Sequence, residues 1–357
     1  MRVLDLTNKD LTDEELQIRV RIMQNITVLI CDRCPQLTTL PEIPTLTELD
    51  CSRCPRLASL PIYPKLTKLY CYQCPLLTAF PEYPKLINLN CSTCFGLTTL
   101  PEIPTLIELT CLDLPLLTRV PIYPQLTNLA CTWCPLLTTL PEIPTLTTLD
   151  CSDNPLLTRI PMYPQLTTFD CSWCPLQTTL PEFPNLINFK CGGWPLLTLP
   201  EFPKLTNLYC SRSPLLTTIP VLPELTSLYC SDCPLLRTLP QLPELTHLYC
   251  YNCPMLTLDY YNYPKLRYIN STESPQVVPK TDAELAEMRE GYQRNKEGVR
   301  AILPKFPQGR EDIGRIILKN LKSMGFGTRR KSRRRKSRRR KSRKSRRRKS
   351  RKRHIYL

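Results

Sequence analysis

The stretch from Leu46 to Lys65 reads LTELDCSRCPRLASLPIYPK, and its pattern, L-x-x-L-x-C-x-x-C-P-x-L-x-x-L-P-x-x-P-x, returns along most of the chain. A further unit holds Ser271 in place of the first cysteine. The repeat therefore determines the architecture, more than the length of 357 residues does. The first cysteine of each unit recurs with a period of 20, with one unit a residue shorter, at Cys31, Cys51, Cys71, Cys91, Cys111, Cys131, Cys151, Cys171, Cys191, Cys210, Cys230 and Cys250.

Within one unit, the apolar positions predict a short strand. If side chains alternate along this strand, Leu49 and Cys51 face the core while Glu48 and Asp50 face solvent. A single unit cannot bury its own leucines, so we expect identical units to stack and bury a continuous column. Thirteen strands spaced by about 4.8 Å would form a parallel sheet roughly 60 Å long.

The segment that returns from one strand to the next carries prolines three residues apart, as in Pro41 and Pro44. Proline inside a helix removes a hydrogen bond and clashes with the preceding turn. We therefore expect an extended, polyproline-like convex side without helices.

This pattern resembles the leucine-rich-repeat family over Ile26 to Pro275, about 70% of the chain. The resemblance implies an α/β repeat fold, a solenoid whose parallel sheet lines a concave, partner-binding face. Cysteines at the sixth and ninth positions, followed by C-P-L-L-T-x-L-P, resemble repeat proteins encoded by giant, mimivirus-like DNA viruses of amoebae. The L-P-x-x-P-x-L part is also similar to short-repeat bacterial effectors, in which a separate ligase domain holds a cysteine nucleophile. All 20 cysteines here lie inside the repeats, so that activity is not implied.

The ends of a solenoid need covering, and helix signals flank the repeats. Thr12 to Glu15 is a capping box that opens a helix running to about Gln24, and Thr281 to Glu284 is a second one. A further helix is predicted from about Arg310 to Met324. We interpret these C-terminal helices as a cap on the last repeat, or alternatively as a partner-binding element. The predicted domains are an N-terminal cap (1–25), the repeats (26–275), C-terminal helices (276–327) and a basic tail (328–357).

The net charge of +17 belongs to the tail. From Arg329 to Arg353 the chain holds 20 lysines or arginines and five serines, and removing those 20 leaves 28 basic against 31 acidic residues, a formal charge of about −3. A segment of this composition is expected to be disordered.

Arginine runs neutralise phosphates without regard to sequence, so we expect the tail to bind nucleic acid or direct the protein to the nucleus. A solvated tail or an anionic membrane surface is the alternative. The expected contacts are Arg333, Arg334, Arg335, Arg338, Arg339, Arg340, Arg346, Arg347 and Arg348, and the expected phosphorylation sites are Ser332, Ser337, Ser342, Ser345 and Ser350.

The cysteines fit a zinc-site spacing, since Cys31, Cys34, Cys51 and Cys54 read C-x2-C-x16-C-x2-C. This spacing also follows automatically from a repeat with two inward cysteines. The second cysteine is replaced by Leu114, Asn154, Trp194 and Ser213 in four units, which a metal cage would not tolerate. We interpret the first cysteine as a core residue and the second as a substitute for a backbone-bonding asparagine. Disulfides between neighbouring strands are the remaining alternative.

No catalytic constellation appears: the chain has two histidines and no G-x-S-x-G, P-loop or H-E-x-x-H motif. We therefore expect no enzyme and no cofactor. The N-terminus lacks an apolar signal segment and no stretch is long enough to span a membrane, so an intracellular protein with reduced thiols is expected, in the host cytoplasm or nucleus or in the virion if it is viral.

Two groups stand out on the predicted strand face. Tyr209, Tyr229 and Tyr249 occupy the same position in consecutive units and should form an aromatic row flanked by Tyr251 and Tyr268, which we predict to bind a protein partner. Tyrosines that simply suit an exposed strand are the alternative. A second group is acidic and is interpreted as a solvated face: Glu48, Asp50, Glu108, Asp113, Asp150, Asp153 and Asp170.

Together these features predict a non-enzymatic protein–protein interaction scaffold, monomeric, with a tail that binds nucleic acid. The alternative is a substrate adaptor for a host ubiquitin ligase, in which residues 276–327 would recruit the machinery.

Overall fold

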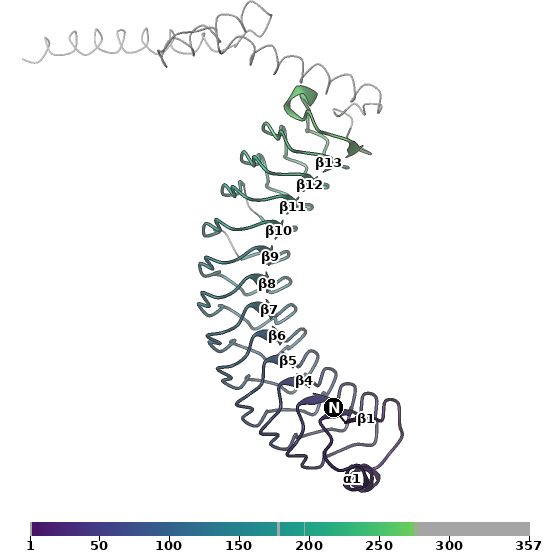
Figure 1. Ribbon diagram of the computed structural model, residues 1–357. Coiled ribbons are helices and arrows are strands. Elements are labelled where there is room, and N and C mark those ends of the chain that lie inside the picture. Colours follow the sequence, from purple (N-terminus) through teal and green to yellow (C-terminus); the bar gives the residue numbers. More distant parts are fainter. Residues whose placement is uncertain (1, 177–178, 196, 275–276, 278–357) are drawn as a thin grey trace, which may run out of the picture. The chain divides into compact units, whose positions relative to one another are not determined.

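The computed structural model describes residues 2–176, 179–195, 197–274 and 277. They form one parallel sheet of 14 strands in which every strand pairs with its neighbours in the sequence (Figure 1). The strands are β1 (Val3–Asp5), β2 (Val28–Ile30), β3 (Glu48–Asp50), β4 (Lys68–Tyr70), β5 (Asn88–Asn90), β6 (Glu108–Thr110), β7 (Asn128–Ala130), β8 (Thr148–Asp150), β9 (Thr168–Asp170), β10 (Asn188–Lys190), β11 (Asn207–Tyr209), β12 (Ser227–Tyr229), β13 (His247–Tyr249) and β14 (Tyr268–Asn270). This is the parallel solenoid that the repeat predicts.

Successive turns stack in strict register. Leu49 of β3 pairs with Leu69 of β4, twenty residues later, and Phe189 of β10 pairs with Leu208 of β11 across the short unit. The ladder continues past the strand, because the Cys51 N–H donates to the Tyr70 carbonyl at 2.8 Å. Each turn is thus bonded to the turn before it and the turn after it.

The eighth position of every repeat adopts the left-handed backbone conformation. Except for Gly193, with φ of 75°, these residues are not glycine, and their φ angles lie between 51° and 59°. Such angles are uncommon for residues with a side chain. The stacked turns hold them, since from Arg33 to Asn252 the N–H of each bonds to the next turn, as Asp153 N–H does to the Ser172 carbonyl at 2.9 Å. The positions are Arg33, Arg53, Gln73, Thr93, Asp113, Trp133, Asp153, Trp173, Gly193, Arg212, Asp232, Asn252 and Glu273.

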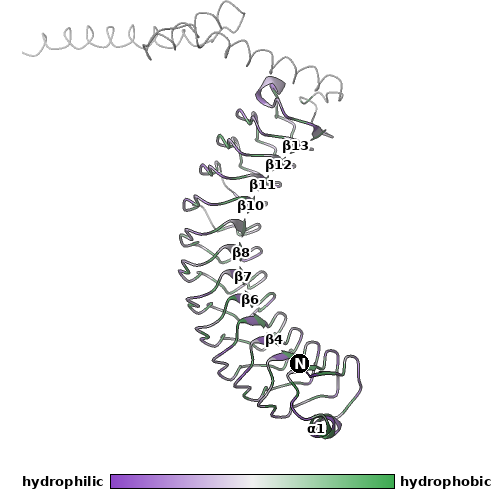
Figure 2. Ribbon diagram, in the orientation of Figure 1, coloured by the Kyte–Doolittle hydropathy of each residue, from purple (hydrophilic) through white to green (hydrophobic). Residues whose placement is uncertain are grey.

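Leucines and cysteines fill the core as the pattern predicts, with Leu49 and Cys51 fully buried. Figure 2 shows hydrophobic and hydrophilic residues interleaved within the turns. The repeat pattern predicts no role for the tyrosines of the return segments. The structure buries Tyr63 and Tyr83 among them. Tyr63 and Tyr83 donate their hydroxyls to the carbonyls of Pro41 and Pro61, both at 3.0 Å. The apolar ring thus fills the core while its hydroxyl stays paired.

The one-residue-shorter unit lies beside an aromatic cluster. Phe169 stacks on Phe189 with ring centroids 5.4 Å apart, and Phe183 meets Phe169 edge-on at 5.3 Å. Trp194 packs edge-on against Phe189 with ring centroids 6.5 Å apart. Phe202 completes the cluster. These buried rings occupy the core beside the point where the repeat changes phase.

The N-terminal segment carries both a helix and a strand. The capping box at Thr12 and Glu15 is present and opens helix α1 (Asp13–Ile22), which buries Leu16 against the first turns. The helix ends at Ile22, slightly before the predicted Gln24. The predicted cap also contains β1, which pairs with β2 and extends the sheet by one strand. The pattern missed β1 because its sequence does not follow the repeat.

The return segments contain turns and, within the described residues, a single short 3-10 helix, η1 (Tyr260–Asn262). No helix among the described residues is long and apolar enough to cross a membrane. The predictions for residues 278–357, which comprise the C-terminal helices, the basic tail and its serines, lie outside the described residues.

Candidate interaction surface

Side chains at the third and fifth positions of each repeat leave the sheet on the side opposite the core, and we call this side the exposed strand face. In β3, Glu48 and Asp50 are partly exposed while Leu49 between them is buried, as the alternation predicts. The exposed strand face therefore presents one column of side chains for each of the two positions.

Three tyrosines form a continuous stack on this face, which we call the tyrosine ladder. The rings of Tyr209 and Tyr229 lie 4.2 Å apart at an angle of 10°, and those of Tyr229 and Tyr249 lie 4.3 Å apart at 7°. The parallel register of β11, β12 and β13 places the three residues directly opposite one another. The spacing of the strands thus sets the spacing of the rings.

The stack determines which part of each ring a partner can reach. Because the faces of Tyr229 are covered by its two neighbours, the ladder offers ring edges and hydroxyl groups to solvent. Burial and the hydrogen bond to Tyr209 raise the pKa of Tyr229 above its ordinary value. The middle of the ladder is therefore a neutral hydrogen-bonding group, and cation–π contact is confined to the ladder's two ends.

The two flanking tyrosines lie differently from each other. Tyr268 tilts against Tyr249, with ring centroids 5.1 Å apart at 44°, although its strand position pairs with His247. Tyr251 lies two residues beyond Tyr249 and interacts with the Asp232 carboxylate, which raises the pKa of its hydroxyl. Tyr268 thus extends the ladder, whereas Tyr251 belongs to a neighbouring column.

The acidic residues are only partly neutralised. Lys68 lies 3.5 Å from Glu48, and Lys190 lies 3.2 Å from Asp170. Burial raises the pKa of Asp150 and Asp153, and neighbouring carboxylates raise both further. The turns around β8 and β9 therefore carry a concentration of negative charge, which favours a solvated or cation-facing surface.

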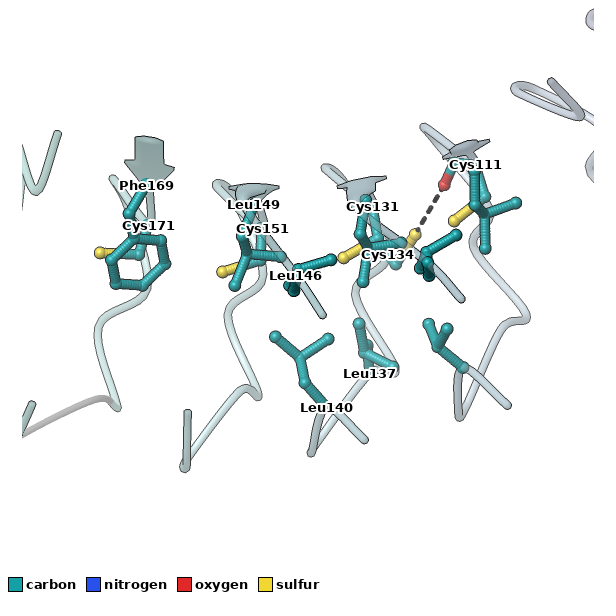
Figure 3. Packing of buried hydrophobic residues seen from close by; sticks show 14 of the residues in the cluster. Cys111, Cys131, Cys134, Leu137, Leu140, Leu146, Leu149, Cys151, Phe169 and Cys171 are labelled. Carbon is teal, nitrogen blue, oxygen red and sulfur yellow. Dashed lines mark hydrogen bonds between the residues drawn. The ribbon is translucent and has the colours of Figure 1, made fainter. Parts of the chain in front are cut away.

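The second cysteine of the repeat bonds backbone, as predicted. The Cys134 thiol donates to the Cys111 carbonyl of the preceding turn at 3.4 Å (Figure 3). All eight cysteines at this site donate in this way to the preceding turn: Cys34, Cys54, Cys74, Cys94, Cys134, Cys174, Cys233 and Cys253.

Asn154 and Ser274 show what these thiols replace. The Asn154 side chain donates to the carbonyls of Cys131 and Cys151 at 2.9 and 2.8 Å and accepts from the Cys134 N–H at 2.9 Å. Ser274 donates to the preceding turn at 2.6 Å and also accepts a backbone N–H. Cysteine, asparagine and serine at the ninth position therefore all satisfy buried backbone groups between turns, as the eight thiols, Asn154 and Ser274 show.

Among the first-site thiols, Cys71 and Cys171 donate to the carbonyls of Asn90 and Lys190 in the following turn, both at 3.5 Å. Burial raises the pKa of Cys91, Cys111 and Cys131 well above the ordinary value for a thiol. All 20 cysteines are buried and unbonded to each other, and the described residues contain no group of three metal-binding side chains. These thiols act in the structure as small apolar core residues.

Thiol titration tests this arrangement. We expect a thiol reagent to react with close to all 20 cysteines in denaturant and with few in the folded protein, because a buried neutral thiol is a poor nucleophile. Measurement of free thiol before and after unfolding, together with metal analysis of the purified protein, checks this. Substantial disulfide content or stoichiometric zinc would contradict the structural role.

Sequence analysis missed two exposed residues on the same side of the turns. Trp133 and Trp173 are 62% and 46% exposed, unusually so for tryptophan. Both occupy the left-handed eighth position. Their exposed fractions show that the two side chains leave the core, and in these two units the sequence has no glycine at the eighth position to signal the turn.

Comparison with known proteins gives matches among solved structures. No family model and no curated protein matches the chain. A leucine-rich repeat protein from Bacteroides ovatus matches with 14% identity and a TM-score of 0.40, covering 67% of this chain and 77% of that protein. YopM from Yersinia enterocolitica matches with 22% identity and a TM-score of 0.39, covering 77% of this chain and 78% of YopM.

Proposed function

We propose that this protein is a non-enzymatic scaffold whose exposed strand face binds a protein partner through the tyrosine ladder. The observation that carries the proposal is the parallel stack of Tyr209, Tyr229 and Tyr249 on a solvent-facing column. Rings fixed by their neighbours lose little freedom when a partner binds, so they contribute contact area at low entropic cost.

The chemistry of the ladder favours an acceptor-rich, extended polypeptide. The hydroxyls follow the stacked rings, and Asn207, Ser227 and His247 stand beside them at the third position of the same strands. Hydroxyl, amide and imidazole groups of this kind can donate hydrogen bonds to the backbone carbonyls of a partner chain. A partner chain running along the ladder would meet a new set of donors at every turn, about every 4.8 Å.

Changing Tyr209, Tyr229 and Tyr249 together to Ser is expected to abolish partner binding and to preserve the fold. The rings lie outside the core, although two stacked pairs worth about 1 kcal/mol each would be lost. Affinity capture with the intact and changed proteins, followed by quantification of each captured protein, measures the effect. Thermal unfolding checks the fold.

Two further variants make this test specific. Changing the three tyrosines to Phe keeps the stack and removes the hydroxyls, so a partner held by hydrogen bonds is lost in both variants. Changing Asn88 and Asn128 to Ala alters the same face at other turns and should leave the partner bound. If the Ser variant captures the partner as well as the intact protein does, the ladder is not the site.

We further propose that the basic tail anchors the scaffold to nucleic acid, through the arginines named above and under the control of the five serines. The support is compositional: 20 of the 48 lysines and arginines fall between Arg329 and Arg353. Phosphates on the serines would lower the positive charge and weaken the contact.

A further inference from the structure

Four consecutive turns alternate acidic and aromatic residues at the eighth position. Asp113, Trp133, Asp153 and Trp173 follow one another at intervals of one turn, about 4.8 Å. Their N–H groups bond to the next turn, at 2.8 Å for Asp113 and 2.9 Å for Trp173. The backbone therefore holds the four side chains in a fixed row outside the core, which we call the edge ladder.

The end of the edge ladder is shaped for an indole. A Cβ atom built on Gly193 would lie 2.6 Å from Cε3 of Trp173, so the Trp173 ring rests directly on the glycine of the following turn. Gly193 is the glycine among the eighth-position residues. The absence of a side chain there lets Trp173 lie across the next turn and still remain 46% exposed.

A row of leucines accompanies the edge ladder on the same four turns. These leucines stand three residues after each rung and are between 42% and 49% exposed: Leu116, Leu136, Leu156 and Leu176. Three residues of chain span at most about 11 Å, so each leucine lies within that distance of its rung, measured between Cα atoms. Exposed apolar side chains repeated over neighbouring turns favour an interaction surface.

The surroundings of the edge ladder are negative. Asp150 and Asp170 stand on the adjoining strands and raise the pKa of Asp153 through their charge. Lys190 neutralises Asp170 in part, at 3.2 Å. The repulsion among these carboxylates falls when a cation approaches, which favours a positively charged ligand at this edge.

We propose that this edge binds a basic, leucine-bearing segment of a partner polypeptide. Arginine or lysine side chains would lie between a carboxylate and an indole, gaining both an ion pair and a cation–π contact, while apolar side chains cover the leucine row. Nucleic acid is disfavoured, because its phosphates would face Asp113 and Asp153. The site is separate from the tyrosine ladder and does not depend on it.

The test uses the full chain and a labelled synthetic peptide of alternating arginine and leucine. Binding is followed by fluorescence anisotropy and by tryptophan emission, since Trp133 and Trp173 would report the contact directly. Trp194 is buried and serves as a reference for the folded state. Peptides of alternating arginine and serine, and of alternating glutamate and leucine, separate the charged from the apolar contribution. We expect the first peptide to bind tightest and the glutamate peptide not to bind.

Variants then locate the site. Changing Asp113 and Asp153 to Asn, or Trp133 and Trp173 to Ser, should each weaken binding about tenfold or more. Changing Leu136 and Leu156 to Ser should remove the preference for the leucine peptide over the serine peptide. The matched control changes Glu102 and Glu142 to Gln, which removes two exposed carboxylates from the return segments and should leave binding unchanged.

Several results would overturn the proposal. One is equal binding of the glutamate and arginine peptides, and another is an equal loss of binding in the Glu102/Glu142 control, which would show nonspecific attraction to negative charge. Unchanged binding in the tryptophan variant would also overturn the proposal. The tyrosine-ladder Ser variant should bind the peptide normally, so failure of that site and failure of this one are distinguishable.

Discussion

A chain shortened to end at Gly327 is expected to lose nearly all affinity for DNA and RNA and to keep its solenoid. The shortened chain carries a formal charge of about −3 once the 20 basic residues of the tail are removed. Its described core extends from Leu6 to Val277 and is retained. Without a cationic segment, the remaining surface repels phosphate.

The intact protein should show the salt dependence of counterion release. Log affinity is expected to fall with log salt by about 0.7 to 0.9 per phosphate neutralised, so contact with about six to ten phosphates would cost about 10³- to 10⁵-fold between 50 and 200 mM salt. Filter binding to unrelated DNA and RNA sequences at several salt concentrations measures this slope and the lack of sequence preference.

Two variants of the tail serines separate the effect of charge from other effects of substitution. Changing Ser332, Ser337, Ser342, Ser345 and Ser350 to Asp adds five negative charges against 20 positive ones, so binding should weaken and persist. The same five changes to Ala alter no charge and should have little effect. If the chain ending at Gly327 binds nucleic acid as well as the intact chain, the solenoid is the binding site and the tail proposal is wrong.

Changing Asn154 to Ala is expected to lower the free energy of unfolding by about 3 kcal/mol. The Asn154 side chain bonds to two carbonyls and one N–H, those of Cys131, Cys151 and Cys134, and it is fully buried. Alanine would leave the Cys131 carbonyl and the Cys134 N–H without a partner where water cannot reach them, and buried unpaired groups are costly. The Cys151 carbonyl would keep its bond from the Cys174 thiol.

Changing Asn154 to Cys supplies the control, because eight other turns already use cysteine at this position. The thiol should donate to the Cys131 carbonyl and accept from the Cys134 N–H, as Cys54 does with the turn before it. We expect the free energy of unfolding to fall by about 1 kcal/mol, because the bond from Asn154 to the Cys151 carbonyl is not replaced. Urea unfolding with reductant present measures both variants. Equal losses for Ala and Cys would show that the ninth-position hydrogen bonds do not stabilise the stack.

Much of the fold follows from the repeat because its period fixes the register. Once Leu49 and Cys51 are assigned to the core, every other unit follows, and the pairing of β3 with β4 confirms it. The role of Cys54 was also predictable, since its substitutes include Asn154. The left-handed turn at the eighth position was not, because Gln73 or Thr93 gives no local signal; the turn is imposed by hydrogen bonds from the neighbouring units.

The two candidate sites also differ in how far the sequence predicts them. The tyrosine ladder was predictable, because Tyr209, Tyr229 and Tyr249 share a strand position and strand positions stack. The edge ladder was predictable only in its acidic half, because Asp113 and Asp153 belong to the acidic group of the predicted strand face. Trp133 and Trp173 look like unrelated loop residues until the turn that directs them outward is known. The buried hydroxyl of Tyr63 was missed for a related reason: its acceptor, the Pro41 carbonyl, lies in the previous unit.

The bonds between turns also bear on how such a protein can change its length. The thiol of each ninth-position cysteine reaches the turn immediately before it, and each left-handed N–H reaches the turn immediately after it. Insertion or removal of one whole unit therefore recreates the same junction, whereas gain or loss of part of a unit breaks it. Copy number becomes a variable that recombination between near-identical repeats can alter in whole steps, moving the tyrosine and edge ladders apart or together without new packing.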